Sequence, residues 1–167
     1  HTNEMAGFPT AAGDVEKFNA TQGVRVQQSE ALVNAGVTER TMGLHAIRRF
    51  QQGEKIIAMW GRYVVRLQKN SIDNSLQLLN DVPRNSQLFM LTNDPRNAAG
   101  YINDPSQHTK TSHIKPNCEM IETDAPLDDV GKVMVYALAD IEGTQENPVE
   151  LWFSYATKHI PGKGKQR

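Results

Sequence analysis

Short apolar runs interrupted by turn-forming residues are the feature of this sequence that most restricts its fold. The runs are rich in β-branched and aromatic side chains and are bounded by Gly, Pro, Asn and Asp, as strands usually are. There is no internal repeat and no regular alternation of strands with helices, which counts against a doubly wound nucleotide-binding fold. The sequence therefore predicts a mainly β domain, with strands at 24–26, 43–47, 55–60, 63–67, 88–91, 118–121 and 132–138.

Two regions depart from this pattern. Ile72, Leu76 and Leu79 recur at helical spacing, which predicts a short helix within 71–81, while Leu78 also permits other structures. Residues 1–23 are rich in Gly, Ala, Thr and Asn without a clear period, so we expect an irregular arm there. We expect one domain over 24–160 and a mobile tail at 161–167.

The bulk composition argues against several classes of protein and site. The 18 basic and 19 acidic side chains give a net charge of −1, so we expect no direct nucleic-acid partner. Cys118 is the sole cysteine, which excludes an internal disulfide and a zinc site built from several cysteines of this chain. No apolar run approaches the ~20 residues of a membrane-spanning helix, and the first residues lack a signal-peptide pattern, so we expect neither membrane insertion nor secretion.

The histidines do not form a recognisable metal-binding pattern. His108 and His113 share the polar loop 105–115, but no cysteine or carboxylate cluster joins them. Solvated loop histidines are therefore favoured over a metal site, and we expect no metal.

Three segments carry motifs that point to function. Residues 150–155 read E-L-W-F-S-Y and follow A-L-A-D-I-E-G at 137–143; taken alone, they are compatible with a strand that packs aromatics on both faces. Residues 100–104 read G-Y-I-N-D and precede P-N-C at 116–118; taken alone, they are compatible with an Asn-Asp-Pro turn. Residues 40–44 read R-T-M-G-L and precede G-E-K-I at 53–56, which a single turn glycine could also explain.

In this order and spacing, the three segments resemble the signature motifs of the SET-domain protein lysine methyltransferases. Those motifs read roughly G-x-G-L-x-A, R-F-x-N-H-S followed by P-N-C, and G-E-E-L-x-F-D-Y. The resemblance spans residues 40–155, which is most of the chain. It implies a fold of small curved sheets and short helices, with a pseudo-knot in which the segments of Asn103 and Tyr155 lie side by side.

The resemblance also implies an activity and a set of site residues. The activity is methyl transfer from S-adenosylmethionine to a protein lysine ε-amine, with a histone tail as default substrate and the nucleus as expected location. By family position Tyr155 is catalytic, and Phe153, where a hydroxyl is lacking, favours di- or trimethylation. Tyr101 and Phe153 would line the lysine channel, whereas Trp152 is expected to pack in the core. Cofactor contacts would come from Arg40, Thr41, Met42, Asn103 and Asp104.

Departures from the family pattern keep an alternative open. Gly100 stands where Arg is usual, Asp104 where His is usual, and Arg62 where Glu is usual. The loops 105–115 and 144–148 are longer than in the family, and we expect the second to bulge at the surface. The alternative is a catalytically silent SET-like module that binds other proteins.

Overall fold

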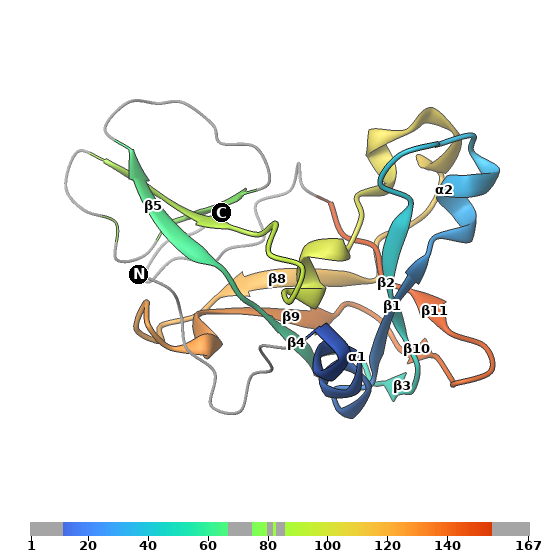
Figure 1. Cartoon of the computed structure of the whole chain (residues 1–167), viewed down its shortest axis with the longest axis horizontal. Helices are drawn as coiled ribbons and strands as arrows, with labels where there is room; N and C mark the ends of the chain where they lie inside the picture. Colours follow the sequence, from blue (N-terminus) through green and yellow to red (C-terminus); the bar gives the residue numbers. More distant parts are fainter. Residues whose placement is uncertain (1–11, 67–74, 80–81, 83–85, 155–167) are drawn as a thin grey trace.

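The computed structural model describes residues 12–66, 75–79, 82 and 86–154 (Figure 1). In these residues, small antiparallel sheets dominate, so the prediction of a mainly β fold is confirmed. One three-stranded sheet has the order β1-β2-β11 and consists of β1 (Val24–Gln28), β2 (Met42–Ala46) and β11 (Val149–Glu150). A second sheet, of order β4-β9-β8, consists of β4 (Lys55–Met59), β9 (Val133–Ala137) and β8 (Cys118–Glu122). A third, of order β5-β7-β6, consists of β5 (Arg62–Arg66), β7 (Gln87–Leu91) and β6 (Ser75–Leu78). A two-stranded ribbon pairs β3 (Arg49–Phe50) with β10 (Ile141–Glu142).

The helices are short and lie around these sheets. Figure 1 shows α2 beside the ends of β1 and β2, and β5 on the opposite side of the molecule from β11. The α-helices are α1 (Ala12–Thr21) and α2 (Glu30–Asn34), and the 3₁₀ turns are η1 (Ala98–Tyr101), η2 (Pro105–Gln107), η3 (Thr109–Thr111) and η4 (Val130–Lys132).

The core follows the alternation of side chains along the strands. In β9, Val133, Val135 and Ala137 are buried while the residues between them are partly exposed. Fully burying one such aliphatic side chain contributes roughly 1.5–3 kcal/mol. Since each predicted strand overlaps an observed one, the apolar runs were sufficient to locate the core; only residue 67 of those runs lies outside the described residues.

The predicted helix at 71–81 is wrong where the structure describes it. Ser75–Leu78 forms strand β6, which pairs with β7 through Leu76 opposite Met90 and Leu78 opposite Leu88. Leu76 and Leu78 fit a two-residue period as well as Leu76 and Leu79 fit a helical one. Pairing with β7 decides between the two readings, and such long-range pairing is not visible in a short sequence window.

The expectation of an irregular arm is wrong for residues 12–21, which form α1. This helix has no strong apolar stripe, which is why the periodicity did not reveal it. It packs against β1 and is followed by Gly23, whose φ of 81° only glycine adopts easily. The tail at 161–167 lies outside the described residues, and the proposed domain limits stay a prediction.

Candidate functional site

Residues 150–153 run between two other segments, and this crossing is the centre of the site. On one side Trp152 forms a parallel bridge with Asn103, and the Phe153 N–H donates to the Asn103 carbonyl oxygen at 3.0 Å. On the other side the Asn117 side-chain oxygen accepts from the Trp152 N–H at 2.9 Å, and its amide donates to the Glu150 carbonyl oxygen at 3.0 Å. The structure thus brings the Asn103 segment beside the strand that leads toward Tyr155, which itself lies outside the described residues.

The Asn103 side chain is held against the start of β2. Its Nδ2 donates to the Met42 carbonyl oxygen at 3.0 Å and lies 3.5 Å from Glu150 Oε2. Arg40 has a φ of 55°, so the chain turns sharply just before β2, and the Thr41 carbonyl oxygen accepts from the Ser29 N–H at 2.6 Å. Two of the predicted cofactor segments, 40–42 and Asn103, are therefore joined by a direct hydrogen bond.

Asp104 is engaged locally and is not directed at the surface. Its side chain is buried and accepts from the Ser106 N–H at 2.8 Å and from the Ser106 hydroxyl at 2.7 Å, which caps η2. An Asp at the start of a turn commonly caps it in this way. The geometry explains why Asp occurs here, and a cofactor contact from Asp104 stays a prediction.

The predicted channel residues lie in or beside the core. Phe153 is 1% exposed and belongs to the apolar core, and Tyr101 is partly buried against the same core at the end of η1. Trp152 is buried as expected, but its side chain also lines a cavity on the outer side of sheet β1-β2-β11. A channel formed with Tyr155 stays a prediction.

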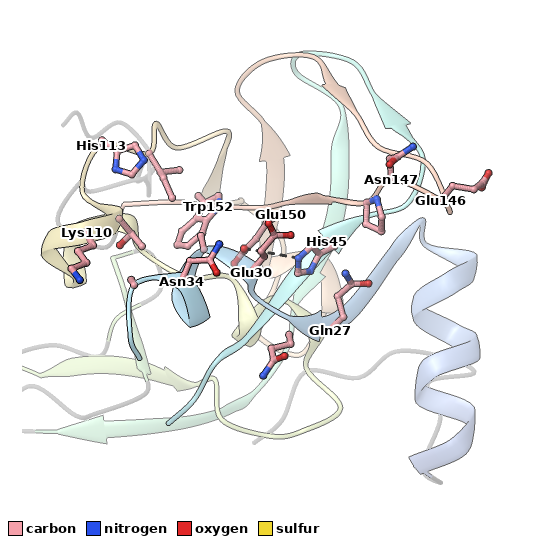
Figure 2. Close-up of a pocket in the computed structure, with 16 residues that line it drawn as sticks. Gln27, Glu30, Asn34, His45, Lys110, His113, Glu146, Asn147, Glu150 and Trp152 are labelled. Atoms are coloured by element: carbon pink, nitrogen blue, oxygen red, sulfur yellow. Dashed lines mark ion pairs between the residues drawn. The ribbon is translucent and has the colours of Figure 1, made fainter. Parts of the chain in front are cut away.

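A buried polar cluster next to Asn103 was missed by sequence reasoning. The Ser29 hydroxyl donates to Glu150 Oε1 at 2.7 Å, and His45 Nε2 lies 3.9 Å from the same oxygen (Figure 2). His45 Nδ1 contacts the Gly43 carbonyl oxygen at 3.2 Å. The only available signal was that His45 occupies an alternate position in an apolar strand, where a histidine faces away from the core.

Burial changes the acid–base behaviour of this cluster. Burial is the main cause that lowers the pKa of His45, with a smaller contribution from the positive charge of Arg25. Burial likewise raises the pKa of Glu150, against the opposing effect of hydrogen bonds from Ser29 and Asn103. The pKa of His45 falls and that of Glu150 rises for the same reason, because burial disfavours the charged form of each side chain. His45 is therefore neutral beside Glu150 at neutral pH.

A cavity of about 890 Å³ lies against this cluster. Its walls come from the end of β1, from α2 and the following Ala35, and from His45, Glu150 and Trp152. The remaining wall residues are Lys110, Thr111, His113, Ile114 and residues 146–148. Figure 2 shows Trp152, Asn34, Glu30 and Glu150 in the middle, with Lys110 and His113 toward one end. The lining includes none of the predicted cofactor residues, so the cavity and the Asn103–Met42 contact are separate parts of the site.

Other binding features are scarce in the described part of the chain. No group of three or more His, Cys, Asp or Glu side chains gathers there in a way that could hold a metal ion. His108 and His113 both occur in the loop that carries η2 and η3, where His113 is exposed. None of the described helices is long and apolar enough to cross a membrane.

Comparison with known proteins supports the fold. No family model matches the sequence, and no curated protein does so either. Among solved structures, the methyltransferase domain of human PR domain-containing protein 2 is similar, with a TM-score of 0.55 and 17% identity over 99% of this chain and 91% of that one.

The chain has a SET-like fold, similar to that of this methyltransferase domain. At 17% identity the similarity establishes the fold and leaves the activity to be argued from the site.

Proposed function

We propose that this protein transfers a methyl group from S-adenosylmethionine to the ε-amine of a lysine in a protein substrate. The observation that carries the proposal is the crossing of residues 150–153 beside Asn103 within a SET-like fold. Tyr155 follows this crossing by two residues in the sequence, and by the resemblance its hydroxyl would be the catalytic one.

The residues near the start of β2 fit the proposed cofactor. A methionine moiety needs donors and acceptors for its carboxylate and ammonium groups, and the Asn103 side chain carries both. Asn103 would exchange its present contacts with Met42 and Glu150 for contacts with the cofactor, beside the backbone of Arg40 and Thr41. Met42 is 40% exposed, so this segment is accessible. When bound, S-adenosylmethionine supplies an electrophilic methyl group on a positively charged sulfur.

The protein's own part in the reaction is desolvation and positioning. A lysine ammonium has no lone pair, so it must lose a proton before it attacks a methyl carbon. Phe153 and Tyr101 would provide apolar surroundings that lower the pKa of a lysine between them. The Tyr155 hydroxyl would orient the free amine in line with the methyl group, and such orientation can contribute several kcal/mol to lowering the barrier.

The finer identity of the substrate rests on the resemblance. A histone tail is the default for this family, and with it a nuclear location and a role in chromatin regulation. A small domain with a net charge of −1 is compatible with a basic peptide substrate, but it does not select one. We therefore propose a histone tail as the first substrate to test.

One observation favours the second candidate, a catalytically silent module that binds proteins. A Cβ atom at Gly100 would contact the Thr92 carbonyl oxygen, so the Arg usual at this position has no room here. The Asp104 side chain is also engaged with Ser106 where the family has His. These two differences lie on either side of Asn103, next to the proposed cofactor contacts.

One experiment separates the two candidates. Cofactor binding is measured by calorimetry, and methylation is measured with radiolabelled cofactor on histones and on total cell protein. If the protein is an enzyme, it binds the cofactor and labels protein. Tyr155→Phe should keep cofactor binding and lose most of the labelling, whereas the control Tyr136→Phe in β9 should keep both. Absence of cofactor binding would support the silent module, and normal turnover in Tyr155→Phe would remove Tyr155 from the mechanism.

A further inference from the structure

The cavity beside Glu150 is built in part from two segments in which this chain departs from the SET pattern. Loop 105–115 contributes Lys110, Thr111, His113 and Ile114 to its wall, and the insertion 144–148 contributes residues 146–148. We propose that this cavity is a second ligand site, which takes a small organic ammonium ion bound by the Glu150 and Glu30 carboxylates against Trp152. The proposal does not depend on methyl transfer.

The size and shape of the cavity suit a small molecule. Its volume of about 890 Å³ falls within the ~300–1,000 Å³ typical of small-molecule sites. Such sites combine apolar or aromatic walls with a few polar groups that fix orientation. Trp152 and Ala35 supply apolar wall, and Asn34 supplies an amide close to the carboxylates (Figure 2).

The charges in the wall select a cation. Three carboxylates line the cavity, from Glu30, Glu146 and Glu150, against one lysine, Lys110. The Glu150 side chain is only 10% exposed, and its two oxygens accept from the Ser29 hydroxyl and the Asn103 amide, which are neutral donors. A protonated amine beside it would bring a positive charge close to this buried carboxyl group and donate a further hydrogen bond to it.

The arrangement also orients the ligand. Trp152 offers an indole surface near the carboxylates, and aromatic faces attract ammonium groups by cation–π interaction. Lys110 lies toward the far end of the cavity from His45, so the positive end of a ligand is directed to Glu150 and Glu30 (Figure 2).

This site borders the proposed cofactor site without coinciding with it. Glu150 Oε1 faces Ser29 and His45, whereas Oε2 faces the Asn103 amide. The Met42 and Asn103 groups proposed to hold the cofactor are not part of the cavity wall. A cofactor and an ammonium ligand should therefore be able to bind at the same time.

The test uses 1,5-diaminopentane as the ammonium probe and 1,5-pentanediol as its uncharged match, titrated calorimetrically into the full chain. We expect the diamine to bind with one-to-one stoichiometry and the diol not to bind. Glu30→Gln should weaken the diamine about tenfold, the size expected for one charge-assisted hydrogen bond, whereas Glu54→Gln, outside the cavity, should leave it unchanged.

Two further variants keep the proposal falsifiable if a charge change disturbs the fold. Ala35→Phe, at the residue that caps the C-terminal end of α2, fills the cavity and should abolish diamine binding. Val33→Phe within α2, 42% exposed and outside the cavity wall, should not. Equal binding of the diol, or diamine binding that survives both Glu30→Gln and Ala35→Phe, would overturn the proposal.

Competition with S-adenosylmethionine distinguishes this proposal from the proposed function. Simultaneous binding of diamine and cofactor supports two sites, whereas strict mutual exclusion would make the cavity part of the cofactor site and overturn the second site. Diamine binding by a protein that does not bind the cofactor would support the cavity proposal while contradicting the proposed methyltransferase.

Discussion

The two faces of sheet β1-β2-β11 are made from alternate residues of the same strands, yet one face forms core and the other lines the polar cavity. On the inner face Val24, Leu44 and Ala46 are each 0% exposed and form core. On the outer face His45 pairs with Glu150 across the strands, and both line the cavity. Successive side chains of a strand point to opposite faces, so a slip of one residue would exchange core and site. Stability and the polar site are thus tied to a single register.

The largest expected effect comes from the inner face. Leu44→Ala removes a fully buried side chain and should lower the free energy of unfolding by about 2–5 kcal/mol, measured by urea denaturation. Met42→Ala, in the same strand but 40% exposed, is the control and should cost much less. Equal losses in the two variants would contradict the assignment of Leu44 to the core.

The second prediction concerns Asn103, whose side chain lies beside the start of β2 and Glu150. Asn103→Ala removes the amide that contacts Met42 and, by the proposed function, the cofactor. Affinity for S-adenosylmethionine should fall about tenfold to a hundredfold, which corresponds to roughly 1.5–3 kcal/mol for a hydrogen bond to a charged group.

Asn117→Ala provides the contrast for this prediction. Asn117 binds the backbone at Glu150 and Trp152, so its loss should lower stability more than cofactor affinity. An unchanged cofactor dissociation constant in Asn103→Ala would leave Asn103 as a turn residue with only a structural role.

The third prediction concerns Phe153, whose side chain faces the core beside the crossing. In the SET family, which the chain resembles, a Tyr at this position commonly holds a water beside the lysine amine, so under the proposed function it would leave less room for a methylated product. The unmodified protein should therefore produce di- or trimethyllysine, and Phe153→Tyr should slow the later methylations, by up to about tenfold. Mass spectrometry of product over time is the measurement, and purely monomethylated product from the unmodified protein would refute it.

The smallest expected effect is a pH dependence from His45. Because burial lowers its pKa below the usual 6.5, the folded state prefers neutral His45. This contribution to stability is fully present above pH 6.5 and is lost as the pH falls from there through the lowered pKa. The pKa of Glu150 is raised, so its contribution to stability changes with pH in the opposite direction. Glu150 must therefore be present in every protein that is compared.

His45→Gln isolates that contribution, since Glu150 and Arg25 remain. The variant should lose less stability than the unmodified protein between pH 7.5 and pH 5.5, as measured by thermal unfolding in matched buffers. His113→Gln, at an exposed position, should behave like the unmodified protein. Identical slopes in all three proteins would show that His45 is not a buried neutral base.

The sequence predicted the strands well and the short elements poorly. Strands such as β9 carry enough apolar and β-branched residues in one short run to be recognised locally. In contrast, β6 depends on pairing with β7, and α2 is a five-residue helix capped by Ser29, whose hydroxyl oxygen accepts from the Leu32 N–H. Elements this short are stabilised mainly by tertiary contacts, so a local pattern cannot identify them.

The site divides in the same way. The motif residues Asn103, Phe153 and Tyr155 could be proposed from the sequence, because each belongs to a short segment whose residue order and spacing resemble a family motif. The grouping of Ser29, His45 and Glu150 could not, since Ser29 and Glu150 are 121 residues apart and meet only after β11 pairs with β2.

By itself, then, the sequence determined the mainly β class, most of the core strands and the motifs that point to methyl transfer. These follow from the alternation of side chains and from the turn chemistry of Gly, Pro, Asn and Asp, which act over a few neighbouring residues. Only the tertiary structure decided that 150–153 threads between Asn103 and Asn117, and that two insertions contribute to the wall of a cavity beside Glu150. Contacts between segments so far apart depend on burial and pairing across the whole fold, which no local pattern encodes.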